Sequence, residues 1–189
     1  MSRLGKKPIQ LPEKVKAEFK NSILEMTGPN GKLSQKIDER ISVKINDGNI
    51  SFEQLGTTRE HNILQGLYRG LAKNMLEGVT NGFKKELEIV GLGYKAGIEG
   101  GKNLTMSVGF SHPVSIEIPP TVKVTAVLNQ EKNTIVTIIG NDKYEVGAFA
   151  AKVRDVKHPE PYKGFGIRYL GEHILRKAGK AAAGGAAKK

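Results

Sequence analysis

The chain has 189 residues, of which 38% are hydrophobic and 26% charged, with a net charge of +11 and no cysteine. This length allows one ordinary domain or two small ones, and the absence of cysteine excludes disulfides and cysteine-ligated metal sites. No apolar run reaches the roughly 18 residues that a membrane span needs, and the basic start lacks the apolar segment of a secretory signal. We therefore expect a soluble, cytoplasmic protein that does not bind membranes.

The positive charge is concentrated at one end of the chain. Residues 1–82 carry 13 Lys and Arg against 9 Asp and Glu, and residues 83–150 carry 7 against 7. Residues 151–189 carry 10 against 3, a net charge of +7. A basic segment confined to one part of a chain is typical of a protein with a polyanionic partner.

Two segments have the apolar periodicity of helices. The first runs from Arg59 to Glu77, where Thr57 and Glu60 are spaced like a capping box. Its predicted core stripe consists of Ile63, Leu64, Leu67, Leu71 and Met75. The second runs over residues 143–157, with Asp142 and Glu145 spaced like a capping box. Its predicted stripe consists of Val146, Phe149, Ala150 and Val153.

A strand–turn–strand pattern precedes each helix, which indicates an internal repeat. Residues 41–52 precede the first helix and residues 122–139 the second, at an offset of about 80–85 residues. We predict an α+β fold of two tandem, structurally similar domains, each a small antiparallel sheet covered by one helix. The expected boundaries are 1–82 for the first domain and 83–170 for the second. Residues 171–189 are expected to form a basic, low-complexity C-terminal extension.

The residues that catalysis or metal binding requires do not occur at workable spacings. No two of the four histidines lie three or four residues apart, and the glycine-rich segments match neither nucleotide-binding fingerprint. Glu86 and Glu88 alternate along an expected strand, and we interpret them as solvated charges. We expect no catalytic residue, no metal site and no cofactor.

One segment, residues 159–169, combines prolines, glycines, aromatic residues and cations in a pattern typical of a loop that binds RNA. Glycines at 164 and 166 permit close approach to another backbone, Tyr162 offers a stacking surface, and Lys163 and Arg168 offer positive charge. Tyr169 is expected to pack on its own domain. The positive run continues through Arg176, Lys177, Lys180, Lys188 and Lys189.

The chain resembles the large-subunit ribosomal protein L6 family, in its bacterial form. The resemblance is carried by five motifs that span the chain in order: SRLGKKPIQLP (2–12), GPNGKL (28–33), VGLGYKAG (90–97), SVGFSHPV (107–114) and PEPYKGFGIRY (159–169), the last followed by GEHILRKAGK (171–180). The family usually has Lys where this chain has Phe165, so a phosphate contact is missing there, although the ring could stack on a base or ribose.

The resemblance implies a structural, non-enzymatic protein of the large ribosomal subunit that binds its (23S) rRNA. It implies a place at the stalk base, near the docking region of translation factors, with the second domain facing the sarcin–ricin region. The expected partners are rRNA and neighbouring ribosomal proteins, and no homo-oligomer is expected. The implied rRNA contacts are Tyr162, Lys163, Gly164, Gly166, Arg168, Arg176, Lys177 and Lys180. Weaker candidates are Arg3, Lys6, Lys7 and Phe165.

Two rival interpretations remain open from the sequence. A small enzyme could use the basic loop as an anion site for a phosphorylated substrate, although no base or nucleophile lies near the loop. A free-standing RNA chaperone could use the same cations but would bind many RNAs. Co-sedimentation with ribosomes at low salt separates the ribosomal protein from the enzyme, and a preference for large-subunit rRNA separates it from the chaperone.

Overall fold

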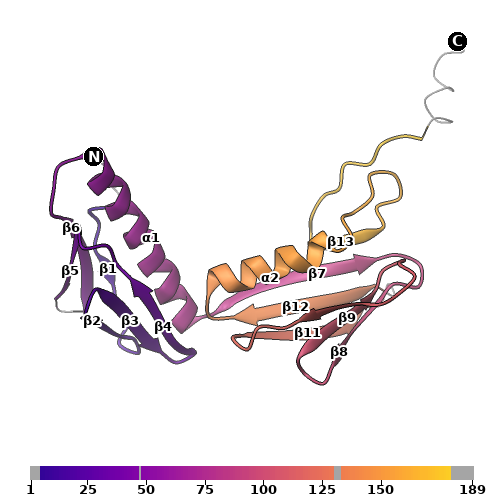
Figure 1. Ribbon diagram of the computed structural model, residues 1–189, viewed down its shortest axis with the longest axis horizontal. Helices are drawn as coiled ribbons and strands as arrows, with labels where there is room; N and C mark the ends of the chain where they lie inside the picture. The colour runs from indigo at the N-terminus through magenta and orange to yellow at the C-terminus, as the bar shows by residue number, and fades with distance from the viewer. Residues whose placement is uncertain (1–4, 47, 130–132, 180–189) are drawn as a thin grey trace, which may run out of the picture. The chain divides into compact units, whose positions relative to one another are not determined.

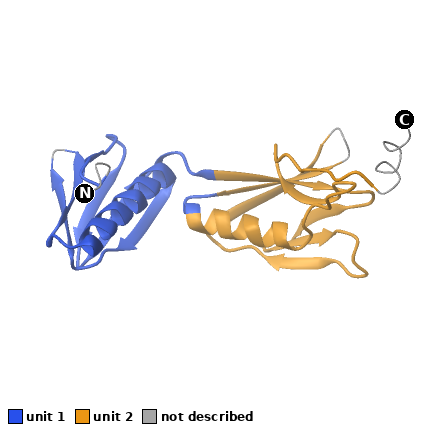
Figure 2. Ribbon diagram, turned by 90° about the horizontal axis from the view of Figure 1, so that it is seen from above, with its two compact units in different colours: residues 1–83, 140–143 blue, residues 84–139, 144–189 orange. Residues whose placement is uncertain are grey.

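The computed structural model describes residues 5–46, 48–129 and 133–179. The chain divides into two compact units: residues 1–83 with 140–143 form unit 1, and residues 84–139 with 144–189 form unit 2 (Figure 2). Each unit combines one long helix with small antiparallel sheets (Figure 1). The predicted α+β class with two tandem domains is confirmed, but each unit contains two small sheets where one was predicted.

Unit 1 consists of two three-stranded sheets and helix α1. In chain order its elements are β1 (Ile9–Gln10), β2 (Lys16–Lys20), β3 (Ile23–Gly28), β4 (Gly31–Lys36), β5 (Ile41–Asn46), β6 (Asn49–Gln54) and α1 (Arg59–Thr80). The sheets have the strand orders β2-β3-β4 and β1-β6-β5, and all their pairings are antiparallel. Helix α1 contacts strands of both sheets, and together they enclose a single hydrophobic core.

The core side of α1 differs from the stripe that periodicity predicts. Ala72, Met75 and Val79 are buried in the unit 1 core, whereas Ile63 is 60% exposed and Leu67 49% exposed. The buried Gln65 takes a core position because its side-chain amide donates to the backbone carbonyl of Phe52 at 2.7 Å. A buried amide is tolerated when such a bond satisfies it. The prediction was therefore wrong for Ile63 and Leu67.

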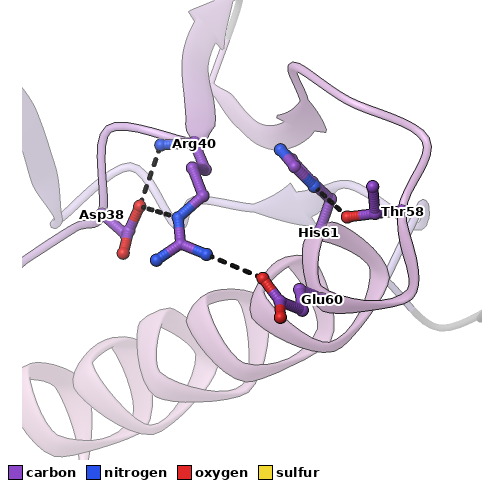
Figure 3. A network of polar contacts seen from close by, with 5 residues as sticks. All are labelled: Asp38, Arg40, Thr58, Glu60 and His61. Carbon is purple, nitrogen blue, oxygen red and sulfur yellow. Dashed lines mark hydrogen bonds and ion pairs between the residues drawn. The ribbon is translucent and has the colours of Figure 1, made fainter.

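The start of α1 is held by an ion-pair network and not by the predicted capping box (Figure 3). The guanidinium of Arg40 contacts the carboxylates of Asp38 and Glu60, each at 3.1 Å. Thr58 occupies the N-cap position without a side-chain capping bond, and its hydroxyl contacts Nδ1 of His61 at 2.5 Å. The backbone N–H of Arg40, with its guanidinium, holds the pKa of Asp38 below its ordinary value.

Unit 2 contains a three-stranded and a four-stranded sheet with helix α2. In chain order its elements are β7 (Phe83–Val90), β8 (Lys95–Glu99), β9 (Asn103–Ser107), β10 (Val114–Glu117), β11 (Val122–Leu128), β12 (Thr134–Gly140), α2 (Lys143–Asp155) and β13 (Gly166–Tyr169). The sheet orders are β10-β9-β8 and β11-β12-β7-β13. Helix α2 runs along the four-stranded sheet (Figure 1) and buries all four residues of its predicted stripe.

We predict that Gly28→Ala destabilises the protein by about 1–3 kcal/mol, the usual cost of overpacking. A Cβ atom at Gly28 would lie 2.7 Å from the backbone oxygen of Val79 and 2.9 Å from its side chain. The matched control is Gly66→Ala within α1, where an added Cβ meets nothing within 4 Å. Alanine there should stabilise the helix by about 0.5–1 kcal/mol. Urea unfolding measures both, and equal effects would contradict the close packing of β3 on α1.

Candidate nucleic-acid interface

The segment between α2 and β13 is a loop closed by its own backbone. The N–H of Glu160 donates to the carbonyl of Phe165 at 2.9 Å, and the N–H of Gly164 donates to the carbonyl of Glu160 at 3.0 Å. Gly164 has φ +77°, a conformation that favours glycine. These bonds shape residues 159–165 without a core of their own, so the side chains at the loop tip face solvent.

Residues 166–169 were interpreted as part of this loop, and that interpretation was wrong. They form β13, an edge strand that pairs antiparallel with β7, with Arg168 opposite Glu88 and Ile167 opposite Ile89. Ile167 is fully buried. The sequence pattern gave no signal of this strand because its partner lies about 80 residues away and the flanking glycines are typical of loops.

Gly166 makes a close approach to its own chain. It is buried with φ +143°, and a Cβ there would lie 2.6 Å from the carbonyl oxygen of His158 and 2.7 Å from Cα of Pro159. The missing side chain therefore lets β13 pass directly beneath the start of the loop. The backbone N–H of Ile167 then donates to the carbonyl of Lys157 at 2.8 Å and fixes this crossing.

The described part of the C-terminal segment folds back onto the loop. The N–H of Lys177 donates to the carbonyl of Pro161 at 2.8 Å, and the guanidinium of Arg176 lies 3.4 Å from where a Cβ of Gly164 would stand. Tyr162 is 55% exposed, and Lys163 is also exposed. We call the exposed side chains of Tyr162, Lys163, Arg176 and Lys177 the basic loop surface.

The guanidinium of Arg168 forms an ion pair with a buried carboxylate. Its Nε and Nη2 atoms donate to Oε2 of Glu88 at 2.9 and 2.7 Å, and the side-chain amide of Asn133 donates to Oε1 of Glu88 at 2.9 Å. The Glu88 side chain is 7% exposed and that of Arg168 is 25% exposed. The expectation that Glu88 is a solvated charge was wrong, because three hydrogen bonds replace its water.

Arg168 also lines an open hollow between β13 and the C-terminal segment. The hollow has a volume of about 360 Å³ and is lined by Arg168, Glu172, His173, Ile174 and Arg176. The charge of Arg168 is offset by Glu88, and Glu172 is engaged by Arg154, with 2.6 Å between Oε1 and Nη2. Arg176 therefore brings the positive charge that is not offset within this hollow.

Glu172 fixes the turn that leads from β13 to the C-terminal segment. Its Oε2 accepts the backbone N–H of Tyr169 at 2.9 Å, and this bond, with Arg154, lowers the pKa of Glu172 below its ordinary value. The ring of Tyr169 makes two cation–π contacts, with Lys85 Nζ at 5.6 Å and the Arg154 guanidinium at 5.5 Å from its centroid. Tyr169 thus packs on its own domain.

The remaining candidates lie apart from this surface. Phe165 is half-buried and lines a second hollow with Leu92, Tyr94 and Leu128, so its ring has apolar neighbours. Lys6 and Lys7 are exposed in unit 1, where the carbonyl of Lys7 accepts a bond from Nε of Arg69 at 2.7 Å. Arg3 and Lys180 lie outside the described residues.

The described residues hold neither a cluster of metal-binding side chains nor a helix that could span a membrane. No group of three or more His, Asp or Glu side chains within these residues is arranged to hold a metal ion. Neither helix of the described chain has the length and apolar character needed to cross a membrane.

Comparison with known proteins shows which family this chain belongs to. The family model described as "Ribosomal protein L6" matches residues 11–82 and 90–170. The chain belongs to the ribosomal protein L6 family. The large ribosomal subunit protein uL6 of Picosynechococcus is 48% identical over 96% of this chain and 98% of its own length. That of Christiangramia forsetii is 46% identical over 96% and 100%, and the uL6c protein of Porphyra purpurea is 44% identical over 97% and 99%.

We predict that Glu88→Ala lowers the free energy of unfolding by about 3 kcal/mol, because it leaves the partly buried Arg168 without its counter-charge. Glu86→Ala is the matched control on the same strand, since Glu86 is 29% exposed and pairs with Lys84; its cost should stay below about 1 kcal/mol. Denaturant unfolding measures both. The double variant Glu88→Leu with Arg168→Met should recover most of the lost free energy of unfolding. If the double variant instead loses the sum of what its two single variants lose, the pairing is contradicted.

We predict a pH-dependent contribution from Glu172. Because its pKa is lower in the folded state than in the unfolded chain, its contribution is complete above the ordinary value of 4.5 and is lost as pH falls through the folded-state value. Glu172→Gln should therefore cost about 1 kcal/mol at pH 7, and the difference from wild type should shrink below pH 4.5. The exposed Glu117 provides a control, Glu117→Gln. A difference independent of pH would refute the role of the charge.

Proposed function

We propose that this chain binds large-subunit (23S) rRNA through the basic loop surface at the end of unit 2 and so helps to hold the large ribosomal subunit together. The structural role follows from the family: L6 proteins are structural constituents of the large ribosomal subunit and not enzymes. The rRNA-binding surface is proposed because the described part of the C-terminal segment folds back onto loop 159–165 and groups three exposed cations beside an exposed tyrosine.

The residues of this surface bind different parts of the RNA. Lys163, Arg176 and Lys177 neutralise phosphates, and the exposed ring of Tyr162 stacks on a base. Arg168 contributes less charge because Glu88 offsets it, and it mainly lines the hollow beneath Arg176.

The two glycines of the loop act through the backbone. Gly164 allows the left-handed turn of the loop and the close approach of the Arg176 side chain. Gly166 allows the start of β13 to pack closely against the backbone of Pro159. Lys180 extends the same positive run. Arg3, Lys6 and Lys7 are proposed as weaker contacts elsewhere on the rRNA, and Phe165 as a minor stacking contact.

We further propose that the protein lies at the stalk base, near the docking region of translation factors, as its family resemblance implies. Its proposed partners are the rRNA, including the sarcin–ricin region, and the neighbouring ribosomal proteins. The three cations suit this role because phosphate contacts fix the position and register of a protein on RNA without requiring a particular base sequence.

The test is the salt dependence of binding to fragments of large-subunit rRNA. Changing Lys163, Arg176 and Lys177 together to Gln removes three phosphate contacts, so the slope of log affinity against log salt should fall by about 2–2.7 units. The melting temperature should not change, because all three side chains are exposed. The control changes Lys14, Lys16 and Lys36, three exposed lysines of unit 1, to Gln and removes the same net charge.

Three outcomes of this assay would contradict the proposal. Equal loss of slope in both triple variants would show a general effect of net charge and would contradict the assignment to the basic loop surface. Equal affinity for unrelated RNAs would indicate an RNA chaperone. Failure of the wild-type chain to bind any large-subunit fragment would overturn the proposal.

A further inference from the structure

A second group of exposed rings and cations lies in unit 2, outside the basic loop surface. It is built by the turn of residues 108–113, which connects β9 to β10. Val108 is fully buried and anchors this turn in the core, whereas Phe110 is 43% exposed and His112 is exposed. The two rings are nearly parallel, with 6.4 Å between centroids and 23° between planes.

The conformation of this turn requires glycine at position 109. Gly109 has φ +80°, and a Cβ there would lie 2.9 Å from the hydroxyl oxygen of Tyr94. A larger residue at 109 would be strained by its backbone and would meet this hydroxyl. The turn therefore keeps Phe110 exposed, although Val108, two residues earlier, is buried in the core.

A cation from another part of the chain covers the Phe110 ring. The ammonium of Lys157 lies 5.1 Å from the ring centroid, a cation–π contact. Lys157 follows α2, and its carbonyl accepts the N–H of Ile167, so its backbone is tied to the start of β13. An exposed pair of rings and a nearby cation are thus brought together from positions almost 50 residues apart in sequence.

We propose that the Phe110–His112 pair is a second RNA contact, on which an unpaired nucleobase stacks while Lys157 meets the adjoining phosphate. The inference rests on the proposed rRNA binding and adds a site to it. A base is flat and fits a pair of nearly parallel rings, and stacking needs little area. A protein partner would need a wider apolar patch, whereas the residues that flank the two rings in the sequence are Ser107, Ser111 and Pro113.

The test measures how the full-length chain binds the large-subunit rRNA fragment that the wild type binds. Phe110→Ala should weaken binding by about 5- to 150-fold, the range for removal of one base–aromatic stack, without changing the salt slope. Phe110→Tyr should keep the affinity, and Phe110→Leu should keep the melting temperature but lose the affinity. Lys157→Gln should lower the salt slope by about 0.7–0.9 units.

The matched control is Tyr144→Ala, which removes a ring that is 80% exposed elsewhere in unit 2. It should leave the affinity unchanged. If Phe110→Ala and the control bind like the wild type while the triple variant of the basic loop surface loses slope, this inference is overturned and the proposed function stands. If the wild type binds no large-subunit fragment, the proposed function itself fails and this inference with it.

A photoreactive benzoyl-phenylalanine at position 110 separates the two classes of partner. With the rRNA fragment and the other large-subunit proteins present together, the crosslink is expected on RNA, at an unpaired nucleotide. A crosslink to a ribosomal protein in place of RNA would overturn the inference and assign this turn to a protein contact.

Discussion

Glu88 and Arg168 face each other across β7 and β13, and the candidate interface depends on this pair. The pair, with the amide of Asn133, fastens the edge strand to the sheet. Because Gly166 at the start of β13 also passes close beneath Pro159, fastening the strand positions the loop, and the loop in turn receives the C-terminal segment at Pro161. A buried carboxylate thus determines where the exposed cations lie.

The formal charge of the last fifth of the chain overstates the charge available to a partner. Arg154 is paired with Glu172 and Arg168 with Glu88, so two cations support the fold. Within the described residues of this segment, Lys163, Arg176 and Lys177 form no ion pair and are exposed. A phosphate that meets them displaces only water and counterions, whereas a phosphate at Arg168 competes with a carboxylate already bound.

Local periodicity was sufficient to predict most of the scaffold but not the site. The helices over 59–80 and 143–155 and the strands before them follow from apolar spacing and turn residues, which act within a few residues. The exposure of Ile63 and Leu67 depends on how α1 is turned toward two sheets, which spacing alone cannot determine. The burial of Glu88, the strand at 166–169 and the contact of Lys157 with Phe110 all depend on partners about 45 to 80 residues away.

The two units share a fold, yet only the second continues after its helix. In unit 1, α1 ends at Thr80 and the chain enters β7 at Phe83. In unit 2, α2 ends at Asp155 and is followed by the loop, β13 and the described C-terminal segment. Every residue of the basic loop surface, and Lys157 beside Phe110, belongs to this continuation. The repeated sheet and helix therefore supply the support, and the chain added after the second copy supplies most of the positive charge that we propose to contact RNA.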